Sequence, residues 1–578
     1  MNKSKKLIAL ALALTLIIAL IVILPACKKN AGSSDEVVVV TDKNGVPVTD
    51  ENGEAITVVL ETEIVEVTNA NGDKVYDENG KVKTSVIYHS KNVEIPLTDK
   101  NGNPVTDANG KIVSTMITVP PKVERVITEV QVTDRNGNFV TDENGEILTY
   151  TLNYTTGIAG QGGNNSNWGT TLGGSQNDSY KAVAATPDGG CVALFQSNSK
   201  DGTVEKLVSD DASVPYIVVI KYDDSGKLKW QKVLSGDGSL SLNSVDVDSD
   251  GNIYAAGYTN AMNLGFQNYG DYDAVLYKLS SSGDVRWVKN FGGRMTDGFN
   301  GVAVGTDGSI VAAGLSASTD GNASVLGLSA GTTAAAVVKF NSNGDIVFAK
   351  AIGSTGDSFN DVDVDPSGNI YAVGNFSSGK GIENYGKADA VIAKFNSSGN
   401  LEWTQHYGGS RIDNFSGINA VGDGCVVVGR SQSSDQSLAA LGNQGDYDAI
   451  IVKYNPNGTI VWENAFRGFY ADGFNDVTTA KDGTIVVCGY SASGSRDLKT
   501  IGNKGGTDGV IVTFNAMGKV SSVQGYGGSR DDKFDCICVL NSGEFVACGS
   551  TLSIDGDLVG ARAPSDGQHT VGMIARFK

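Results

Sequence analysis

An aspartate recurs six times in the C-terminal part of the chain, each time two residues before an aromatic residue. The six are Asp178, Asp297, Asp357, Asp413, Asp472 and Asp532. Carboxylates at equivalent places of a repeat can converge, and there they could hold a calcium ion or exchange protons with a substrate. An aspartate at a turn can also accept the N–H groups of that turn, which is the structural alternative. Both interpretations stay open at this stage.

Other groups that could do chemistry are scarce. The histidines of the chain are His89, His406 and His569. The places equivalent to His406 in other copies of the repeat hold no second base. Asp246, Asp248 and Asp250 imitate the start of a calcium loop, but Gly257 stands where the closing glutamate belongs, so a structural turn is favoured. We therefore predict no catalytic residue and no cofactor, with calcium at the aspartates as the one open possibility.

Composition and charge narrow the class of partner. The chain of 578 residues has 74 glycines and 11 prolines, which indicates many tight turns between short strands. Its 65 acidic and 45 basic residues give a formal net charge of −20. Such a surface repels phosphate backbones, so nucleic acid is excluded as an expected partner.

The N-terminus has the layout of an export signal. A basic start is followed by an apolar run over residues 7–24 and by the sequence Leu-Pro-Ala-Cys, which ends at Cys27. This ending resembles a bacterial lipobox, which implies removal of a signal peptide, residues 1–26, and a lipid on the Cys27 thiol. A flexible tether, residues 27–36, is then expected to start on the extracytoplasmic face of the cell membrane. An uncleaved transmembrane helix is the alternative, since about 18 apolar residues can just span a bilayer.

Two families of repeats divide the rest of the chain. The first occupies residues 37–156, and its four copies begin at Thr41, Thr68, Thr98 and Thr133. Each copy holds two Asn-Gly dipeptides, the strongest short-range signal for a β-hairpin. We predict a stalk of four β-hairpin repeats, in which Asp-x-Asn-Gly serves turns rather than calcium binding. A Gly/Asn-rich linker follows at residues 157–165.

The second family of repeats, residues 166–578, predicts a β-propeller. One place in the repeat is filled by Trp168, Trp230, Trp287, Phe348, Trp403, Trp462 and Ser522. A glycine precedes this place by four residues in each internal copy, and each period contains four short strands joined by turns. Four antiparallel strands in a period of this length are typical of a propeller blade. The predicted fold class is therefore all-β.

Counting strands gives seven blades and a closed ring. The domain begins with a fourth strand, from Trp168 to Leu172, and ends in a third strand, from Met573 to Phe577. Pairing these two strands completes the seventh blade and leaves the ring without an open sheet edge. We thus predict a split last blade that is closed by both ends of the domain.

The repeat resembles a known family. Asp-Gly-Asn-Ile-Tyr-Ala-Ala-Gly at 250–257, the stretch from Asp389 to Trp403 and Tyr-Gly-Gly-Ser at 407–410 resemble the seven-bladed β-propeller repeats of exported bacterial proteins. The resemblance implies the fold and no agreed activity. The turn before Trp230 is also similar to the tryptophan-docking repeat of quinoprotein dehydrogenases, but those enzymes usually have more blades.

Six cysteines remain besides the one in the lipobox. Cys191 and Cys425 take a second-strand place that other copies fill with Ile, and Cys488 and Cys548 replace Ala or Val. We expect them to be small apolar core residues. Cys536 and Cys548 could face each other across one hairpin, so one disulfide stays possible.

The connections predict two different faces of the disc. Turns between first and second strands and between third and fourth strands are tight, whereas second-to-third-strand connections are long and varied. Strand alternation places the long loops on one face, together with the crossings into each new blade. First strands line the channel of a propeller, so the six aspartates are expected to ring its mouth. The second blade departs, with Leu240 in the aspartate place and Leu242 in the aromatic one.

Varied loops on a rigid scaffold are typical of recognition. We therefore expect a lipid-anchored binding or scaffolding module without enzymatic activity, whose partner is a surface protein or a glycan. Two alternatives stay open. One is an enzyme, quinoprotein-like or glycan-active, that uses the acidic channel mouth, and the other is a passive spacer in the envelope.

Overall fold

A computed structural model describes eight strands within residues 37–154 and most of the C-terminal region. There it covers residues 169–205, 215–266, 268–377, 385–443, 446–494, 497–498, 503–558 and 568–577. The predicted signal peptide, Cys27, the tether, the linker and Trp168 lie outside the described residues. The chain divides into two compact units, Met1–Arg125 and Val126–Lys578.

The N-terminal strands form four antiparallel pairs. They are β1 (Val37–Val39) with β2 (Thr57–Val59), β3 (Thr62–Glu66) with β4 (Thr84–Tyr88), β5 (Lys91–Pro96) with β6 (Ser114–Val119), and β7 (Val126–Gln131) with β8 (Thr149–Tyr154). Each pair brackets one copy of the Asn-Gly repeat, so the repeat period and the strand pairing coincide.

The C-terminal region contains seven four-stranded antiparallel sheets. Blade 1 has β10 (Asp178–Ala185), β11 (Cys191–Ser197), β12 (Tyr216–Tyr222) and β13 (Leu228–Leu234). Blade 2 has β14 (Leu240–Val247), β15 (Ile253–Thr259), β16 (Asp273–Leu279) and β17 (Val285–Phe291). Blade 3 has β18 (Asp297–Val304), β19 (Ile310–Ser316), β20 (Ala334–Phe340) and β21 (Ile346–Ile352). Blade 4 has β22 (Ser358–Val364), β23 (Ile370–Phe376), β24 (Asp389–Phe395) and β25 (Leu401–Tyr407).

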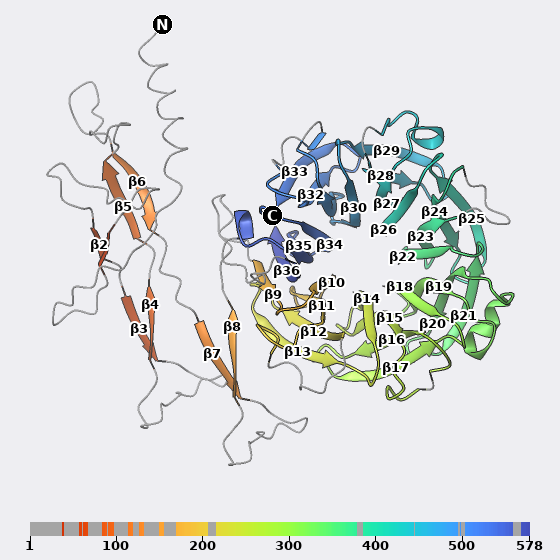
Figure 1. The fold of residues 1–578 in the computed structure, drawn as a ribbon, viewed down its shortest axis with the longest axis horizontal. Coiled ribbons are helices and arrows are strands. Elements are labelled where there is room, and N and C mark those ends of the chain that lie inside the picture. The colour runs from red at the N-terminus through yellow and green to blue at the C-terminus, as the bar shows by residue number, and fades with distance from the viewer. Residues whose placement is uncertain are drawn as a thin grey trace, which may run out of the picture. The chain divides into compact units, whose positions relative to one another are not determined.

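The remaining three blades repeat this plan. Blade 5 has β26 (Asp413–Val421), β27 (Gly424–Ser431), β28 (Asp448–Tyr454) and β29 (Ile460–Phe466). Blade 6 has β30 (Asp472–Thr479), β31 (Ile485–Ser491), β32 (Asp508–Phe514) and β33 (Val520–Tyr526). Blade 7 has β34 (Asp532–Val539), β35 (Phe545–Thr551), β36 (Val571–Phe577) and β9 (Gly169–Leu172). Short 3-10 helices lie at Gly321–Leu326, Gln436–Leu438 and Gly556–Leu558. The region is a seven-bladed all-β propeller (Figure 1).

The two ends of the propeller share blade 7. Strand β9 pairs with β36, with Leu172 opposite Gly572 and Gly169 opposite Ala575. The start of the propeller sequence therefore lies beside its end, as the yellow and blue strands show in Figure 1. Strand β36 begins at Val571, slightly earlier than the sequence pattern suggested.

The core lies between blades rather than within one sheet. Second and third strands are nearly continuous apolar runs, because neighbouring blades cover both of their faces. Strand β12 is buried along its whole length, whereas the outer strand β25 is mostly half-buried or exposed. One apolar cluster, for example, joins Val337 of blade 3 to Ala372 and Val391 of blade 4.

The recurring glycine of one blade packs against the recurring tryptophan of the preceding blade. Gly458, in the turn before β29, has φ 86°, and a Cβ there would lie 3.0 Å from the Trp403 ring of the preceding blade. The Trp403 indole N–H also donates to the carbonyl oxygen of Pro456 at 3.1 Å. The same stacking joins Gly283 to Trp230 and Gly518 to Trp462. The glycine therefore serves the tryptophan of the previous copy, not its own.

Candidate functional site

The six sequence-predicted aspartates are all buried, with at most 1% of each residue exposed. Asp297 accepts the Gly293 N–H at 2.9 Å, the Ser318 hydroxyl at 2.6 Å and the Ser316 hydroxyl. Each carboxylate thus ties the crossing that precedes its blade to the end of the second strand of that blade. Asp178, Asp413, Asp472 and Asp532 accept the hydroxyls of the same two places.

Asp357 varies the same scheme. It accepts the backbone N–H groups of Ser354 at 2.6 Å and Ser377 at 2.8 Å. In the second blade, Leu240 replaces the aspartate and is fully buried in the core. The contacts favour the turn-capping interpretation of the six aspartates, because their oxygens are engaged by nearby donors. The pattern Ser/Thr-x-Ser at the end of the second strand was the sequence signal for this role.

A second set of aspartates was missed by the sequence analysis. They are Asp273, Asp389, Asp448 and Asp508, each the first residue of a third strand. Each precedes a capping aspartate of the next blade by 24 residues, which is the signal that could have found them. All four are buried.

Three of these aspartates lie beside a capping aspartate of the next blade. Each of the three has one carboxylate oxygen without a hydrogen-bond partner among the described residues. A Cβ built on Gly527 would lie 2.4 Å from Asp508 Oδ1 and 2.6 Å from Asp532 Oδ2. Gly292 and Gly408 lie in the same way between Asp273 and Asp297 and between Asp389 and Asp413. The Oδ1 atoms of Asp273, Asp389 and Asp508 have no hydrogen-bond partner among the described residues.

Burial sets the charge state of these pairs. The pKa of Asp508 is raised to about 6, chiefly by loss of hydration, and the neighbouring Asp532 contributes to the increase. Burial likewise raises the pKa of Asp472 to about 7, with Asp448 acting in the same direction. The pKa values of Asp273 and Asp389 are also raised, chiefly by burial. These carboxyl groups therefore hold protons more readily than aspartates in water.

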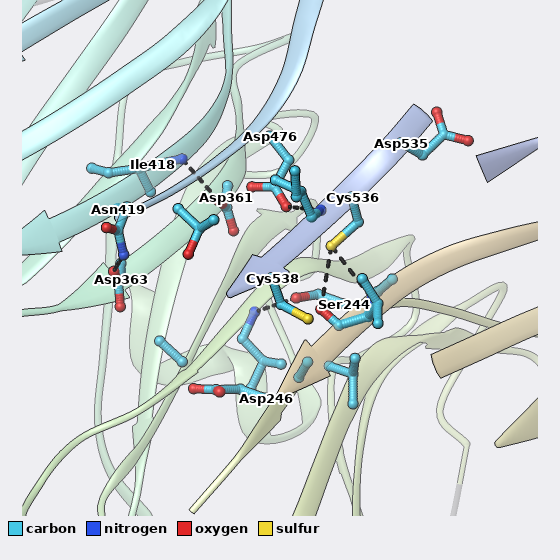
Figure 2. A pocket seen from close by; sticks show the side chains of 18 of the residues that line it. Ser244, Asp246, Asp361, Asp363, Ile418, Asn419, Asp476, Asp535, Cys536 and Cys538 are labelled. Atoms are coloured by element: carbon cyan, nitrogen blue, oxygen red, sulfur yellow. Dashed lines mark hydrogen bonds between the residues drawn. The ribbon is translucent and has the colours of Figure 1, made fainter. Parts of the chain in front are cut away.

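The central channel forms a cavity of about 350 Å³ between the first strands of all seven blades. Its wall carries Asp246, Asp361, Asp363, Asp476 and Asp535, while none of the six capping aspartates lines it. Figure 2 shows Asp361, Asp363 and Asp476 around this space, near Cys536 and Cys538 of β34. The acidic channel was expected from the sequence, but with different residues.

The channel carboxylates join neighbouring blades. A first strand is a sheet edge, so its N–H groups need partners from outside its own blade. Asp361 accepts the Ile418 N–H at 3.0 Å, and Asp476 accepts the Ile537 N–H at 2.9 Å. Asp363 of blade 4 accepts the Ala420 N–H of blade 5 at 2.7 Å.

Amide side chains serve the edge carbonyl groups in the same way. Asn243, Asn300, Asn360 and Asn475 each donate to the carbonyl of an aromatic residue in the next first strand, at 2.7–3.0 Å. Each of these asparagines lies at an irregularity in the strand register, a β-bulge that turns it toward the channel. The polar lining therefore satisfies the innermost strands.

Burial also raises the pKa values in the channel. It raises the pKa of Asp246 to about 6 and that of Asp363 to about 7, against the lowering effect of their backbone donors. The pKa values of Asp361 and Asp476 are raised by burial as well, and for Asp361 the nearby Asp476 adds to the effect. In the part of the chain that the structure describes, no three His, Cys, Asp or Glu residues are placed to hold a metal ion.

The described residues include His406, Cys536 and Cys548, three of the histidine and cysteine positions considered in the sequence. His406 Nδ1 lies 3.7 Å from Asp389 Oδ2, and its ring lies against Tyr385 with centroids 4.7 Å apart. Cys536 is opposite Cys548 in the strand register, but both are free thiols. Burial raises the pKa of these two thiols well above the usual value, which makes them poor nucleophiles.

The loop face carries exposed apolar side chains. We define it as the second-to-third-strand loops and the crossings between blades. Large hydrophobic residues are exposed on it at Met262, Tyr269, Met295, Val325, Tyr385, Phe469, Tyr470 and Ile554. Exposed hydrophobic groups on loops that a rigid scaffold carries are a common feature of binding surfaces.

Comparisons with known proteins agree with the repeat architecture. A family model described as "Beta-propeller repeat" matches residues 234–265, which run from the end of β13 through β15. Regulatory protein FlaEY of Caulobacter vibrioides is 26% identical over 326 residues, 50% of this chain and 34% of that protein. A WD repeat-containing protein of Acanthamoeba polyphaga mimivirus, L264, is 24% identical over 345 residues, 50% of this chain and 22% of that protein. This chain thus matches about a third or less of the length of these relatives.

Solved structures also resemble the chain. A protein of unknown function from Dyadobacter fermentans has a TM-score of 0.34 at 12% identity, and the match covers 71% of this chain and 98% of that one. The Hadza microbial sialidase Hz136 has a TM-score of 0.32 at 10% identity, with coverage of 61% and 65%.

Proposed function

We propose that this chain is a lipid-anchored protein on the extracytoplasmic face of the cell membrane, and that its propeller binds a partner through the loop face without catalysis. The observation that carries the proposal is a difference between two sets of residues, the recurrent polar residues and the exposed hydrophobic residues of the loop face. Recurrent polar residues are engaged in turns and between first strands. The loop face, in contrast, exposes the large hydrophobic side chains named above.

The lipid anchor rests on the sequence before Cys27. Among the described residues, no helix is both long and apolar enough to cross a bilayer, and residues 7–24 lie outside them. A net charge of −20 keeps the body of the protein away from an anionic membrane surface. The tether after Cys27 would leave the loop face accessible to partners.

Photo-crosslinking on cells tests which face binds. Val325 on the loop face and Val347 at the start of an outer strand are 63% and 57% exposed, so they form a matched pair. A photoreactive residue at position 325 of the full chain should give adducts of defined mass, and the same residue at 347 should give none. Equal crosslinking from both positions, or adducts from 347 alone, would contradict the proposal.

The acidic channel is the second candidate site. The observation in its favour is that Asp246 and Asp363 have pKa values raised to about 6 and 7, a property of many functional carboxylates. If the channel or the six aspartates held calcium, calcium would raise the melting temperature by mass action. We expect no such shift, because turn and edge donors already occupy the carboxylates. A calcium-dependent rise that Asp363→Asn or Asp357→Asn removes would favour the second candidate.

A further inference from the structure

One part of the loop face departs from the repeat. The next-to-last place of the second strand holds Gln196, Tyr258, Leu315, Asn375, Arg430, Tyr490 and Ser550 in blades 1 to 7. Blade 5 alone has an arginine there. The crossing into blade 6 has Phe469 and Tyr470, where two other crossings have Ser-Arg. Most residues that keep a blade folded recur from copy to copy, so surface departures gathered at one junction point to a different use.

The Arg430 guanidinium is held in place. Its central carbon lies 4.5 Å from the centre of the Tyr447 ring, a stacking arrangement that suits the planar cation. One of its N–H groups donates to the Tyr490 hydroxyl of the next blade at 2.7 Å. Tyr490 can take this position because Gly473 lies under it, where a Cβ would approach the ring to 3.0 Å. The half-buried cation is therefore preorganised and keeps other N–H groups for a ligand.

Two exposed rings adjoin this cation through the backbone. Phe469 and Tyr470 are 56% and 65% exposed. The crossing that carries them is fixed, because the Tyr470 N–H donates to the Ser493 hydroxyl at 3.0 Å and the Asp472 N–H donates to the Tyr447 carbonyl at 2.8 Å. The rings therefore project from a rigid segment that is bonded to the residue on which Arg430 stacks.

Planar amide groups lie close to Arg430, because Asn414 is opposite it in the strand register and Gln432 follows it by two residues. Gln432 donates to Asp446 at 3.0 Å, in an exposed place, and Asn414 donates to the Asn375 side chain at 3.3 Å. A protein-binding hot spot is usually enclosed and dry, whereas this junction exposes two aromatic rings and carries amide groups beside its cation. Sugar rings offer the matching pattern, since their C–H groups pack on aromatic faces and their hydroxyls pair with amides. The guanidinium fork adds a fit for a carboxylate.

We propose that Arg430, Tyr447, Tyr490, Phe469 and Tyr470 form a site for a glycan that carries a carboxylate, such as a uronic acid. The inference rests on the proposed function and names a ligand class for one part of the loop face. A single fixed cation on a chain of net charge −20 suits one carboxylate at a time and disfavours a dense polyanion.

Calorimetric titration of the full chain tests the site, with tetrasaccharides of glucuronate and of galacturonate as probes and their methyl esters as neutral analogues. We expect at least one acidic probe to bind and its ester to bind at least tenfold more weakly. Arg430→Gln, which copies the residue of blade 1, should weaken binding at least tenfold. Phe469→Ser, which copies Ser410 of another crossing, should weaken it severalfold.

Arg411→Gln is the matched control, since Arg411 is exposed on the loop face in a crossing without aromatic residues. It should leave binding unchanged, and all three variants should unfold cooperatively well above the temperature of the titration, which shows that they are folded. The proposal is overturned if neither acidic probe binds, if the ester binds equally, if Arg430→Gln has no effect, or if an oligoglutamate peptide competes as well as the sugar. Crosslinks from position 325 that persist in Arg430→Gln would leave the binding function standing and separate the two failures.

Discussion

At the scale of single residues, paired carboxylates make the propeller sensitive to pH. Asp508 is fully buried. A Cβ built on Gly527 would lie 2.4 Å from Asp508 Oδ1 and 2.6 Å from Asp532 Oδ2, so the two carboxylates are close together. The folded pKa of Asp508 is raised to about 6, above the value of about 3.9 in an unfolded chain. Between about pH 4 and pH 6, the folded protein therefore binds one proton at Asp508 that the unfolded chain does not bind. Its stabilising effect is complete below about pH 4 and is lost as the pH rises through 6.

Asp508→Asn tests this coupling. The new amide can donate toward Asp532 and still accept the Lys504 N–H that Asp508 accepts at 2.8 Å. We expect the variant to be more stable than the wild type at pH 8, by about 1 kcal/mol, and nearly equal to it at pH 5, as measured by denaturant unfolding. The control is Asp178→Asn, because Asp178 lies beside Val571 rather than a carboxylate. It should lose about 1 kcal/mol at both pH values. Equal destabilisation by Asp508→Asn at pH 5 and pH 8 would contradict the coupling.

The residues also show where sequence reasoning stops. The recurrence of Asp178 and its equivalents could be recognised in the sequence. Recurrence alone, however, does not predict whether a carboxylate faces the channel or its own turn. The answer lay in a second pattern, Ser197-x-Ser199 and its equivalents, which supplies the donors. Arg430 differs from every equivalent residue, but its stacking on Tyr447, the residue before β28, depends on the three-dimensional structure and has no sequence signal.

At the scale of elements, a tryptophan and a turn glycine hold neighbouring blades together. This packing explains why blade 6 has Ser522 at the position where most other blades have a tryptophan. The next blade takes its third and fourth strands from opposite ends of the chain, so no continuous turn is there to receive a ring. The period and the blade count were predictable, because every copy repeats them. The partner of each tryptophan was not, since its glycine lies in another copy.

Trp403→Ala should therefore lower stability by about 2–4 kcal/mol, because it removes a large ring from the junction of two blades and leaves a gap. Ser522→Ala is the control: it removes a hydroxyl that is hydrogen-bonded to the Thr513 hydroxyl at 2.8 Å but no ring, so it should cost no more than about 1 kcal/mol. Thermal and denaturant unfolding measure both. A loss for Trp403→Ala no greater than for the control would argue against the packing role.

Closure of the ring depends on the last strand. Strand β36 lies between β35 and β9, so deletion of residues 571–578 removes an inner strand and exposes two sheet edges, which favours aggregation. We expect this deletion to abolish cooperative unfolding, observed by calorimetry, or to yield only aggregates. Deletion of residues 27–156 should leave the melting temperature of the propeller unchanged. A cooperative transition at the wild-type temperature in the first deletion would refute the closure.

At the scale of the whole molecule, the sequence predicts attachment through Cys27. Cys27→Ser removes the thiol that a lipid would modify, so we expect loss of radiolabelled fatty acid and release of the protein from the membrane fraction. Cys191→Ser is a suitable control, because Cys191 is buried in β11 and should not affect labelling. Undiminished labelling of Cys27→Ser would remove the lipoprotein proposal and leave the transmembrane helix as the anchor.

The central claim is that the loop face meets a partner, and not the opposite face, which carries the tight turns between first and second strands and between third and fourth strands. Hydroxyl-radical footprinting tests it directly, because three methionines report on the two faces. Met262 and Met295 lie on the loop face and are 67% and 51% exposed, and Met517 lies in a third-to-fourth-strand turn and is 79% exposed. Their oxidation is compared between the purified full chain and the protein on intact cells. We predict that Met262 or Met295 becomes protected on cells while Met517 is oxidised as in the purified protein. Protection of Met517 alone, or equal oxidation of all three in both samples, would contradict the account.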